Sequence, residues 1–157
     1  MRTFLILSTL FLITITKLSA CTCAEENNSF RKKVKTEFLS SDVIFTGTVL
    51  SRKEVSNTSR KVFGSPVMFT FKISEMIKGK LQHAQIEILT NSDGASCGYD
   101  FEVEKTYLVY SRQSDYYTHV TKSKSDLTTG LCTRNQKLKD TRKKELRILS
   151  NMARSGK

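Results

Sequence analysis

The residues best suited to chemistry in this sequence of 157 residues are its cysteines and histidines. The cysteines are Cys21, Cys23, Cys97 and Cys132, and the histidines are His83 and His119. Four thiols can form two disulfides or one zinc site. The two histidines are far apart in the sequence, with no nucleophile motif near either, so we expect both to be surface residues rather than catalytic groups.

The first twenty residues indicate the compartment in which these thiols work. Residues 4–15 form an apolar run behind Arg2, and residues 17–20 end in small side chains, as in a secretory signal peptide. The run is too short to span a membrane comfortably. We therefore expect a secreted protein with a signal peptide over residues 1–20 and one domain over residues 21–157. Cleavage after Ala20 would give Cys21 a free α-amine.

A second interpretation of the same segment is a bacterial lipobox, formed by residues 18–21. In that case Cys21 would carry lipid on its sulfur and an acyl group on its nitrogen, and the protein would be anchored in the cell envelope. Leu18 favours the lipobox over an ordinary cleavage site, whereas Lys17 is unusual in a lipoprotein signal. Contact with a membrane is expected only under this alternative.

Export to an oxidising compartment predicts that the four cysteines form two disulfides. A bridge between Cys21 and Cys23 would close a strained small ring, so we expect each of them to pair with Cys97 or Cys132. Each such bridge closes a loop of about 80 to 110 residues and can stabilise the fold by about 4 kcal/mol. A zinc site of four thiols is less favoured, because structural sites usually contain Cys-x₂₋₄-Cys pairs.

The pattern of apolar residues predicts a mainly β domain. Phe30, Val34 and Phe38 predict a short amphipathic helix behind a cap at Ser29. Strands are expected over 43–50, 67–73 and 86–88, at Phe101, Val103, Tyr107 and Val109, and over 116–121. Residues 138–152 suggest a closing helix on Leu138, Leu146, Leu149 and Met152. A small closed Greek-key barrel of five strands with flanking helices is the favoured architecture, and a sandwich is the alternative.

The formal net charge of +11 is concentrated near the C-terminal end. Residues 21–121 carry 13 basic and 12 acidic side chains, whereas residues 122–157 carry 11 basic and 3 acidic ones. A basic segment of this kind predicts contact with an anionic polysaccharide, although a solvated helix face is the simpler explanation. The candidate residues are Lys137, Lys139, Arg142, Lys143, Lys144 and Arg147. Export and disulfides argue against nucleic acid as a partner.

Other polar residues give no sign of an enzyme or of a cofactor. Carboxylates flank and follow Cys97, but their spacing is typical of a solvated face rather than of a glycosidase pair. These residues are Asp93, Asp100, Glu102 and Glu104. Asn27 and Asn57 begin glycosylation sequons, which matter only in a eukaryotic source.

Several segments together resemble the netrin-like domain of tissue inhibitors of metalloproteinases. They are CTC at 21–23, SDVIFTG at 41–47, FKISE at 71–75, KG at 78–79, CG at 97–98, YLVY at 107–110 and LC at 131–132. The resemblance covers essentially the whole chain after residue 20. It implies a five-stranded OB-fold barrel with bridges between Cys21 and Cys97 and between Cys23 and Cys132.

The sequence also differs from the animal inhibitors. It has no cysteine between Cys23 and Cys97, so their third bridge in this domain has no counterpart. Residues 24–28 replace their stretch containing Pro and His, and their cysteine-rich C-terminal subdomain is missing. The chain therefore resembles a single-domain relative with two disulfides.

The resemblance implies a way of inhibiting zinc proteases. The α-amine and carbonyl of Cys21 would chelate the catalytic zinc of the protease, and Thr22 would enter the pocket for the substrate side chain. Ala95 and Ser96 would flank this wedge, with the bridges of Cys21 and Cys23 holding it rigid. The alternative is a non-inhibitory binding module, either anchored by lipid on Cys21 or bound to polyanions. Lipidation and this inhibition exclude each other.

Overall fold

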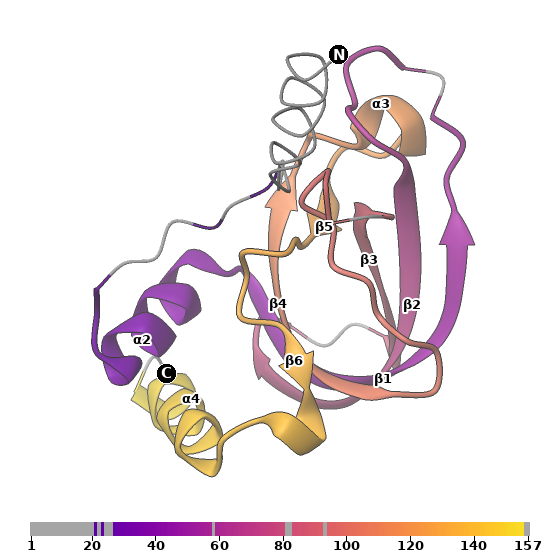
Figure 1. Cartoon of the computed structure of the whole chain (residues 1–157). Helices are drawn as coiled ribbons and strands as arrows, with labels where there is room; N and C mark the ends of the chain where they lie inside the picture. Colours follow the sequence, from indigo (N-terminus) through magenta and orange to yellow (C-terminus); the bar gives the residue numbers. More distant parts are fainter. Residues whose placement is uncertain are drawn as a thin grey trace, which may run out of the picture.

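The computed structural model describes residues 21, 23, 27–57, 59–80, 83–92 and 94–155. Within them the chain is mainly β, with helices beside the sheet (Figure 1). The expected signal peptide and Thr22 lie outside the described residues. In the part of the chain that is described, no helix has the length and apolar character needed to cross a membrane.

All six strands belong to one sheet. Their bounds are β1 Val43–Glu54, β2 Pro66–Lys78, β3 Gln85–Asn91, β4 Thr106–Ser114, β5 Asp126–Thr128 and β6 Gln136–Lys137. They pair in the order β1-β2-β3-β5-β4-β6, and β1 also pairs with β4, so five strands close into a ring. Only the β3–β5 pairing is parallel among the described strands. A sandwich would require two sheets.

The helices of the described chain are α2 Phe30–Ser40, α3 Thr118–Thr121 and α4 Lys143–Ser155, with a 3₁₀ turn, η1, over Leu138–Asp140. The helices α2 and α4 lie near the two ends of the described chain, as the sequence predicts, whereas α3 lies between β4 and β5. The Ser29 hydroxyl accepts a hydrogen bond from the Lys32 backbone N–H at 3.4 Å, as expected of an N-cap. The predictions of a mainly β fold and of flanking helices are confirmed.

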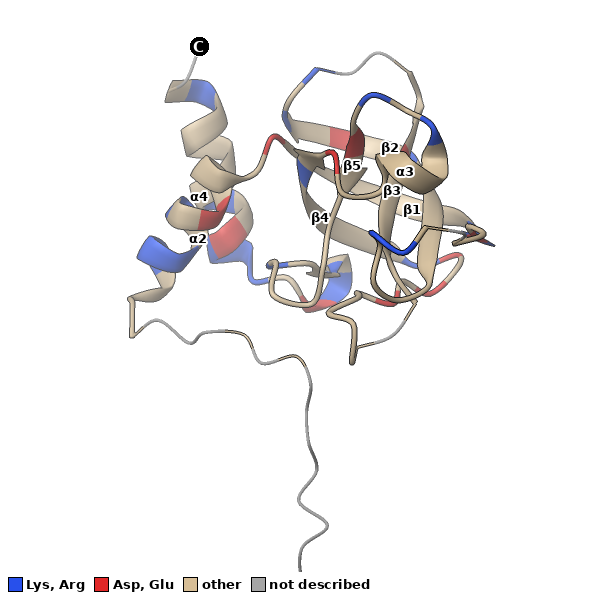
Figure 2. Cartoon of the chain, turned by 90° about the horizontal axis from the view of Figure 1, so that it is seen from above, with Lys and Arg blue, Asp and Glu red and all other residues tan. Residues whose placement is uncertain are grey.

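Two hydrophobic clusters use opposite faces of the same strands, because successive residues of a strand point to opposite sides. One is largely aromatic, and its rings meet edge to face with centroids 5.0 to 5.4 Å apart; they belong to Phe45, Phe69, Phe71, Phe101 and Tyr107. The other packs α2 and α4 against β1 and β4 through Val34, Phe38, Ile44, Leu108, Tyr110 and Leu149. Figures 1 and 2 show α2 and α4 side by side next to the sheet.

The prediction of a strand over residues 116–121 is wrong, because Thr118–Thr121 form α3. Tyr117 and Val120, three residues apart, both pack into a small cluster with buried Val62 and Leu89. Periodicity does not separate a strand from one helical turn over so short a run.

Two other boundaries also differ from the sequence predictions. Phe101 and Val103 precede β4, because a turn intervenes in which the Lys105 N–H donates to the Glu102 carbonyl at 3.3 Å and Glu104 has φ +66°. Leu138 belongs to η1 and not to the closing helix, which begins at Lys143.

Candidate functional site

Two disulfides fix the start of the described chain to two separate loops. Cys21 is bonded to Cys97 with a Cα–Cα distance of 5.4 Å, and Cys23 to Cys132 at 5.3 Å. This is the pairing that the resemblance implies, and it uses all four sulfurs. We call Cys21, Cys23, residues 95–97 and Cys132 the disulfide surface. Thr22, the residue expected to enter the protease pocket, lies outside the described residues.

The two loops of the disulfide surface contact each other directly. The Leu131 N–H donates to the Cys97 carbonyl at 2.8 Å. A Cβ on Gly130 would approach the same carbonyl to 2.8 Å, so only glycine allows this contact. Cys97 itself has φ +60°, and its N–H donates to the Gly94 carbonyl at 3.2 Å. The two bridges therefore end on two loops that are joined to each other by a backbone hydrogen bond.

The residues expected to flank the wedge lie in the same loop as Cys97. Ala95 is exposed and Ser96 is half-buried. Asn91, at the end of β3, donates through Nδ2 to the Ser96 carbonyl at 2.8 Å, which ties the loop to the sheet. Cys23 is exposed, whereas Cys21 is only 8 % exposed.

The loop that carries Cys132 is held by hydroxyl and amide side chains. Thr129 donates to the Tyr110 carbonyl at 2.7 Å, and Thr133 donates to the Gly130 carbonyl at 2.7 Å. Asn135 donates to both threonine hydroxyls and accepts from the Tyr110 N–H at 2.9 Å. Buried polar groups paired in this way give a rigid loop.

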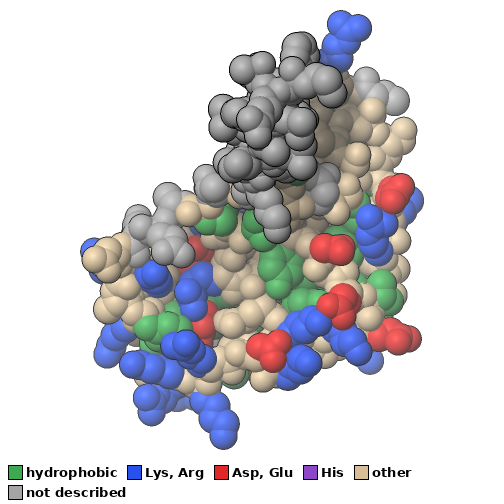
Figure 3. All heavy atoms as spheres, in the orientation of Figure 1, with side chains coloured by type: hydrophobic (Ala, Val, Ile, Leu, Met, Phe, Trp, Pro, Cys, Tyr) green, Lys and Arg blue, Asp and Glu red, His purple; other side chains and the backbone are tan. Residues whose placement is uncertain are grey.

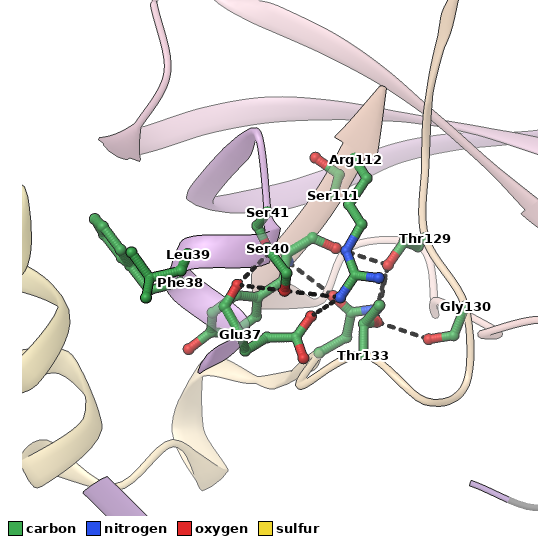
Figure 4. Close-up of polar contacts among 12 residues, drawn as sticks. Glu37, Phe38, Leu39, Ser40, Ser41, Ser111, Arg112, Thr129, Gly130 and Thr133 are labelled. Carbon is green, nitrogen blue, oxygen red and sulfur yellow. Dashed lines mark hydrogen bonds and ion pairs between the residues drawn. The ribbon is translucent and has the colours of Figure 1, made fainter. Parts of the chain in front are cut away.

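Strand β4 connects this loop to α2. Arg112 donates to Glu37 Oε1 at 3.0 Å and to the Ser40 hydroxyl at 2.9 Å. Figure 4 shows the Arg112 guanidinium facing Glu37 and Ser40 at the end of α2. The disulfide surface and α2 are thus attached to the same strand.

Sequence reasoning missed that the turn at Phe63 and Gly64 lies close to Ser96. Phe63 is 76 % exposed, and its backbone N–H donates to the Tyr116 hydroxyl at 2.8 Å. Gly64, with φ +85°, lies so near that a Cβ there would be 2.9 Å from the Ser96 Cβ. The turn at Gly64 therefore lies against Ser96, next to the disulfide surface. Its position outside the alternating strand pattern was the only signal in the sequence.

The six basic residues predicted from the sequence lie on different elements of the structure. Lys137, in β6, donates to Glu102, a bond that raises the pKa of Lys137 and lowers that of Glu102. Arg142 lies over the Phe30 ring. Lys143, Lys144 and Arg147 lie in α4, and Lys139 is exposed in η1.

The histidines and carboxylates form no metal site in the described part of the chain. His83 and His119 are both exposed. No three groups among His, Cys, Asp and Glu converge there in a way that could hold a metal ion. What the described residues offer chemically is a backbone that is fixed at Cys21 and Cys23 by two disulfides.

No family model matches the sequence, and no curated protein matches it.

Proposed function

We propose that this protein is a secreted inhibitor of zinc metalloproteinases, built as a netrin-like OB-fold barrel, which binds the protease zinc through Cys21. The barrel assignment is supported by the closed ring of five strands and by the resemblance of the sequence. In this proposal the signal peptide ends at Ala20 and Cys21 becomes the first residue.

The observation that carries the proposal is the double attachment of Cys21 and Cys23. Their bridges lead to loops joined by the bond from the Leu131 N–H to the Cys97 carbonyl. A segment held at both of its ends loses little conformational entropy on binding, which favours insertion into a narrow cleft. Ala95, two residues before Cys97, then offers an exposed small side chain close to this segment.

The chemistry of chelation follows from the mature start. A catalytic zinc keeps one coordination position open for water or substrate. An α-amine has a reference pKa of about 7.7 to 8.0. Near neutral pH it therefore loses its proton to solvent at little cost when its nitrogen binds a metal ion. The amine nitrogen and the carbonyl oxygen of Cys21 form a compact bidentate ligand that displaces the zinc-bound water. Thr22 would provide the side chain for the neighbouring specificity pocket.

The bridge at Cys21 also supports inhibition over lipid anchoring. A lipidated cysteine needs its sulfur for a thioether, and here that sulfur is bonded to Cys97. Acylation of the nitrogen would in addition remove the lone pair that binds zinc. The tethered, non-inhibitory module is therefore the outcome expected only if Cys21 is found acylated.

The test begins with the protein recovered after export. Intact mass and N-terminal sequencing should show an unblocked Cys21 and two disulfides. This protein should inhibit members of a panel of zinc proteases, whereas a matched form with one Ala added before Cys21 should not. Equal inhibition by the two forms would contradict chelation, and an unblocked protein that inhibits no member of the panel would refute the proposed function.

A further inference from the structure

Helices α2 and α4 enclose a groove with a volume of about 350 Å³. Four of its side chains are basic: Arg31 and Lys35 from α2, and Lys144 and Arg147 from α4. The remaining described residues that line it are neutral, namely Ile148, Asn151, Met152 and Ser155. Figure 3 shows Lys and Arg side chains gathered over these two helices, at the lower left. We call this feature the two-helix groove.

The four cations of the two-helix groove are not neutralised by the described residues. The ion pairs of the described chain join Arg52 to Glu54, Arg112 to Glu37, Arg134 to Glu145 and Lys137 to Glu102. Because like charges repel across so small a space, the groove has a positive potential that a bound anion would relieve.

The positive surface continues from Lys144 to the ring of Phe30. Three cationic groups lie over this ring: Arg142 at 5.2 Å, Arg134 at 5.3 Å and Lys144 at 5.9 Å from its centroid. The negative face of an aromatic ring stabilises nearby cations, so Phe30 helps to keep these side chains together. Of the three, Arg134 is already paired with Glu145, while Arg142 and Lys144 extend the groove.

We infer that the two-helix groove binds a linear sulfated polysaccharide. A groove lined by ammonium and guanidinium groups suits a chain with repeated anionic groups, and guanidinium groups hold planar or tetrahedral oxyanions through two donors. Asn151 and Ser155 supply neutral hydrogen-bonding groups of the kind that sugar hydroxyls require.

A membrane surface fits the two-helix groove less well. A helix that binds lipid presents an exposed apolar face. On α4, Leu149 is buried, and Leu146, Ile148 and Met152 pack toward the cluster beneath the helices. Leu39 is the one large apolar side chain on either helix that is strongly exposed.

The two-helix groove differs from the basic segment that the sequence suggested. Lys137 is held by Glu102, and two of the four basic side chains of the groove come from α2, more than a hundred residues earlier in the chain. None of the groove residues belongs to the disulfide surface. The inference therefore stands independently of the proposed function.

The test compares two variants of the purified protein with equal loss of charge. The groove variant is Arg31→Gln, Lys35→Gln, Lys144→Gln and Arg147→Gln. The control variant is Lys32→Gln, Lys33→Gln, Lys143→Gln and Arg154→Gln, from the same helices but outside the lining of the groove. Affinity for a size-defined heparin fragment should fall by about tenfold or more in the groove variant and by only about twofold in the control. Urea unfolding should show that both variants are folded.

Any one of three results would overturn the inference. Equal losses in the two variants would mean that net charge alone attracts heparin. Tighter binding to phosphatidylserine vesicles than to heparin would assign the groove to a membrane. Absence of heparin binding by the unmodified protein at physiological salt would remove the site altogether. Inhibition of a protease should stay unchanged in the groove variant, so failure of either proposal can be recognised separately.

Discussion

Glu145 is the charged residue on which the attachment of α4 depends. It is 1 % exposed, and both of its oxygens are paired. Arg134 donates to Oε1 at 3.0 Å and to Oε2 at 2.8 Å. The Tyr110 hydroxyl donates to Oε1 at 2.8 Å, and Gln136 donates to Oε2 at 3.0 Å. A buried carboxylate with so many donors holds α4 to β4 and β6.

We expect Glu145→Gln to lower the free energy of unfolding by about 3 kcal/mol, because it leaves the half-buried Arg134 without its counter-charge. Tyr110→Phe removes only one of several donors and should cost about 1 kcal/mol. Urea unfolding at neutral pH measures both. A smaller loss for Glu145→Gln than for Tyr110→Phe would show that the ion pair contributes little to stability.

Buried tyrosines predict a loss of stability in alkali. Burial, followed by the charge of Glu145, raises the pKa of Tyr110 above its ordinary value of 10.0. Burial also raises the pKa of Tyr99 and of Tyr117 to about 12. In the unfolded chain these groups ionise near pH 10, whereas in the folded protein they stay protonated. Their contribution to the free energy of unfolding is therefore complete below about pH 10 and is lost as the pH rises above that value.

The measurement is the difference in unfolding free energy between the unmodified protein and Tyr110→Phe. Phenylalanine does not titrate, so this difference should shrink between about pH 10 and about pH 12. A difference that stays constant over this interval would contradict the raised pKa of Tyr110.

At the scale of elements, Lys78 at the end of β2 fixes the end of α2. Its ammonium group donates to the Phe38 carbonyl at 2.8 Å and to the Ser41 carbonyl, and it lies 5.0 Å from the centre of the Phe38 ring. A cation at a helix C-terminus satisfies carbonyls that have no partner within the helix. This contact links α2 to the strand ring.

We expect Lys78→Met to destabilise the fold by about 1 to 2 kcal/mol, because the final carbonyls of α2 lose their donor. Lys72→Met is the matched control, since Lys72 is exposed on the same strand. Amide exchange should accelerate at the end of α2 in the first variant alone. Similar unfolding midpoints for both variants would exclude this role of Lys78.

Elements with a repeated pattern could be predicted from the sequence, and short ones could not. The β-branched run that starts at Val43 and the four-residue spacing of Val34 and Phe38 gave β1 and α2. β5 and β6, of 3 and 2 residues, are too short to show any period, and their places depend on pairing with β4. An aromatic residue such as Phe101 predicts a strand, but here its burial comes from packing against the aromatic cluster and not from a place in a strand.

The candidate sites show the same division. The cysteines could be recognised from residue type alone, and so could the excess of basic residues near the C-terminal end. The approach of Gly64 to Ser96 could not, because it follows from the turn at Gly64 and from the bond between the Phe63 N–H and the Tyr116 hydroxyl. That Arg31 and Arg147 line the same groove likewise depends on how α2 and α4 pack.

At the scale of the whole molecule, α2 and α4 bring together basic residues that are far apart in the sequence. Folding adds the basic residues of α2 to those of α4, as Figure 2 shows. The disulfide surface is formed by other loops, and its proposed chemistry is metal coordination by a backbone segment. The two proposed activities therefore differ in their dependence on salt.

We expect the affinity for heparin to fall by more than about tenfold between about 0.05 and 0.5 M NaCl, because the Debye length shortens and exposed charges are screened. The inhibition constant for a sensitive zinc protease should change by less than about threefold over the same range, because chelation and apolar contacts are not screened in this way. Both constants can be measured on one preparation. An inhibition constant as sensitive to salt as heparin binding would mean that the protease also contacts the two-helix groove, and the two surfaces would then be one.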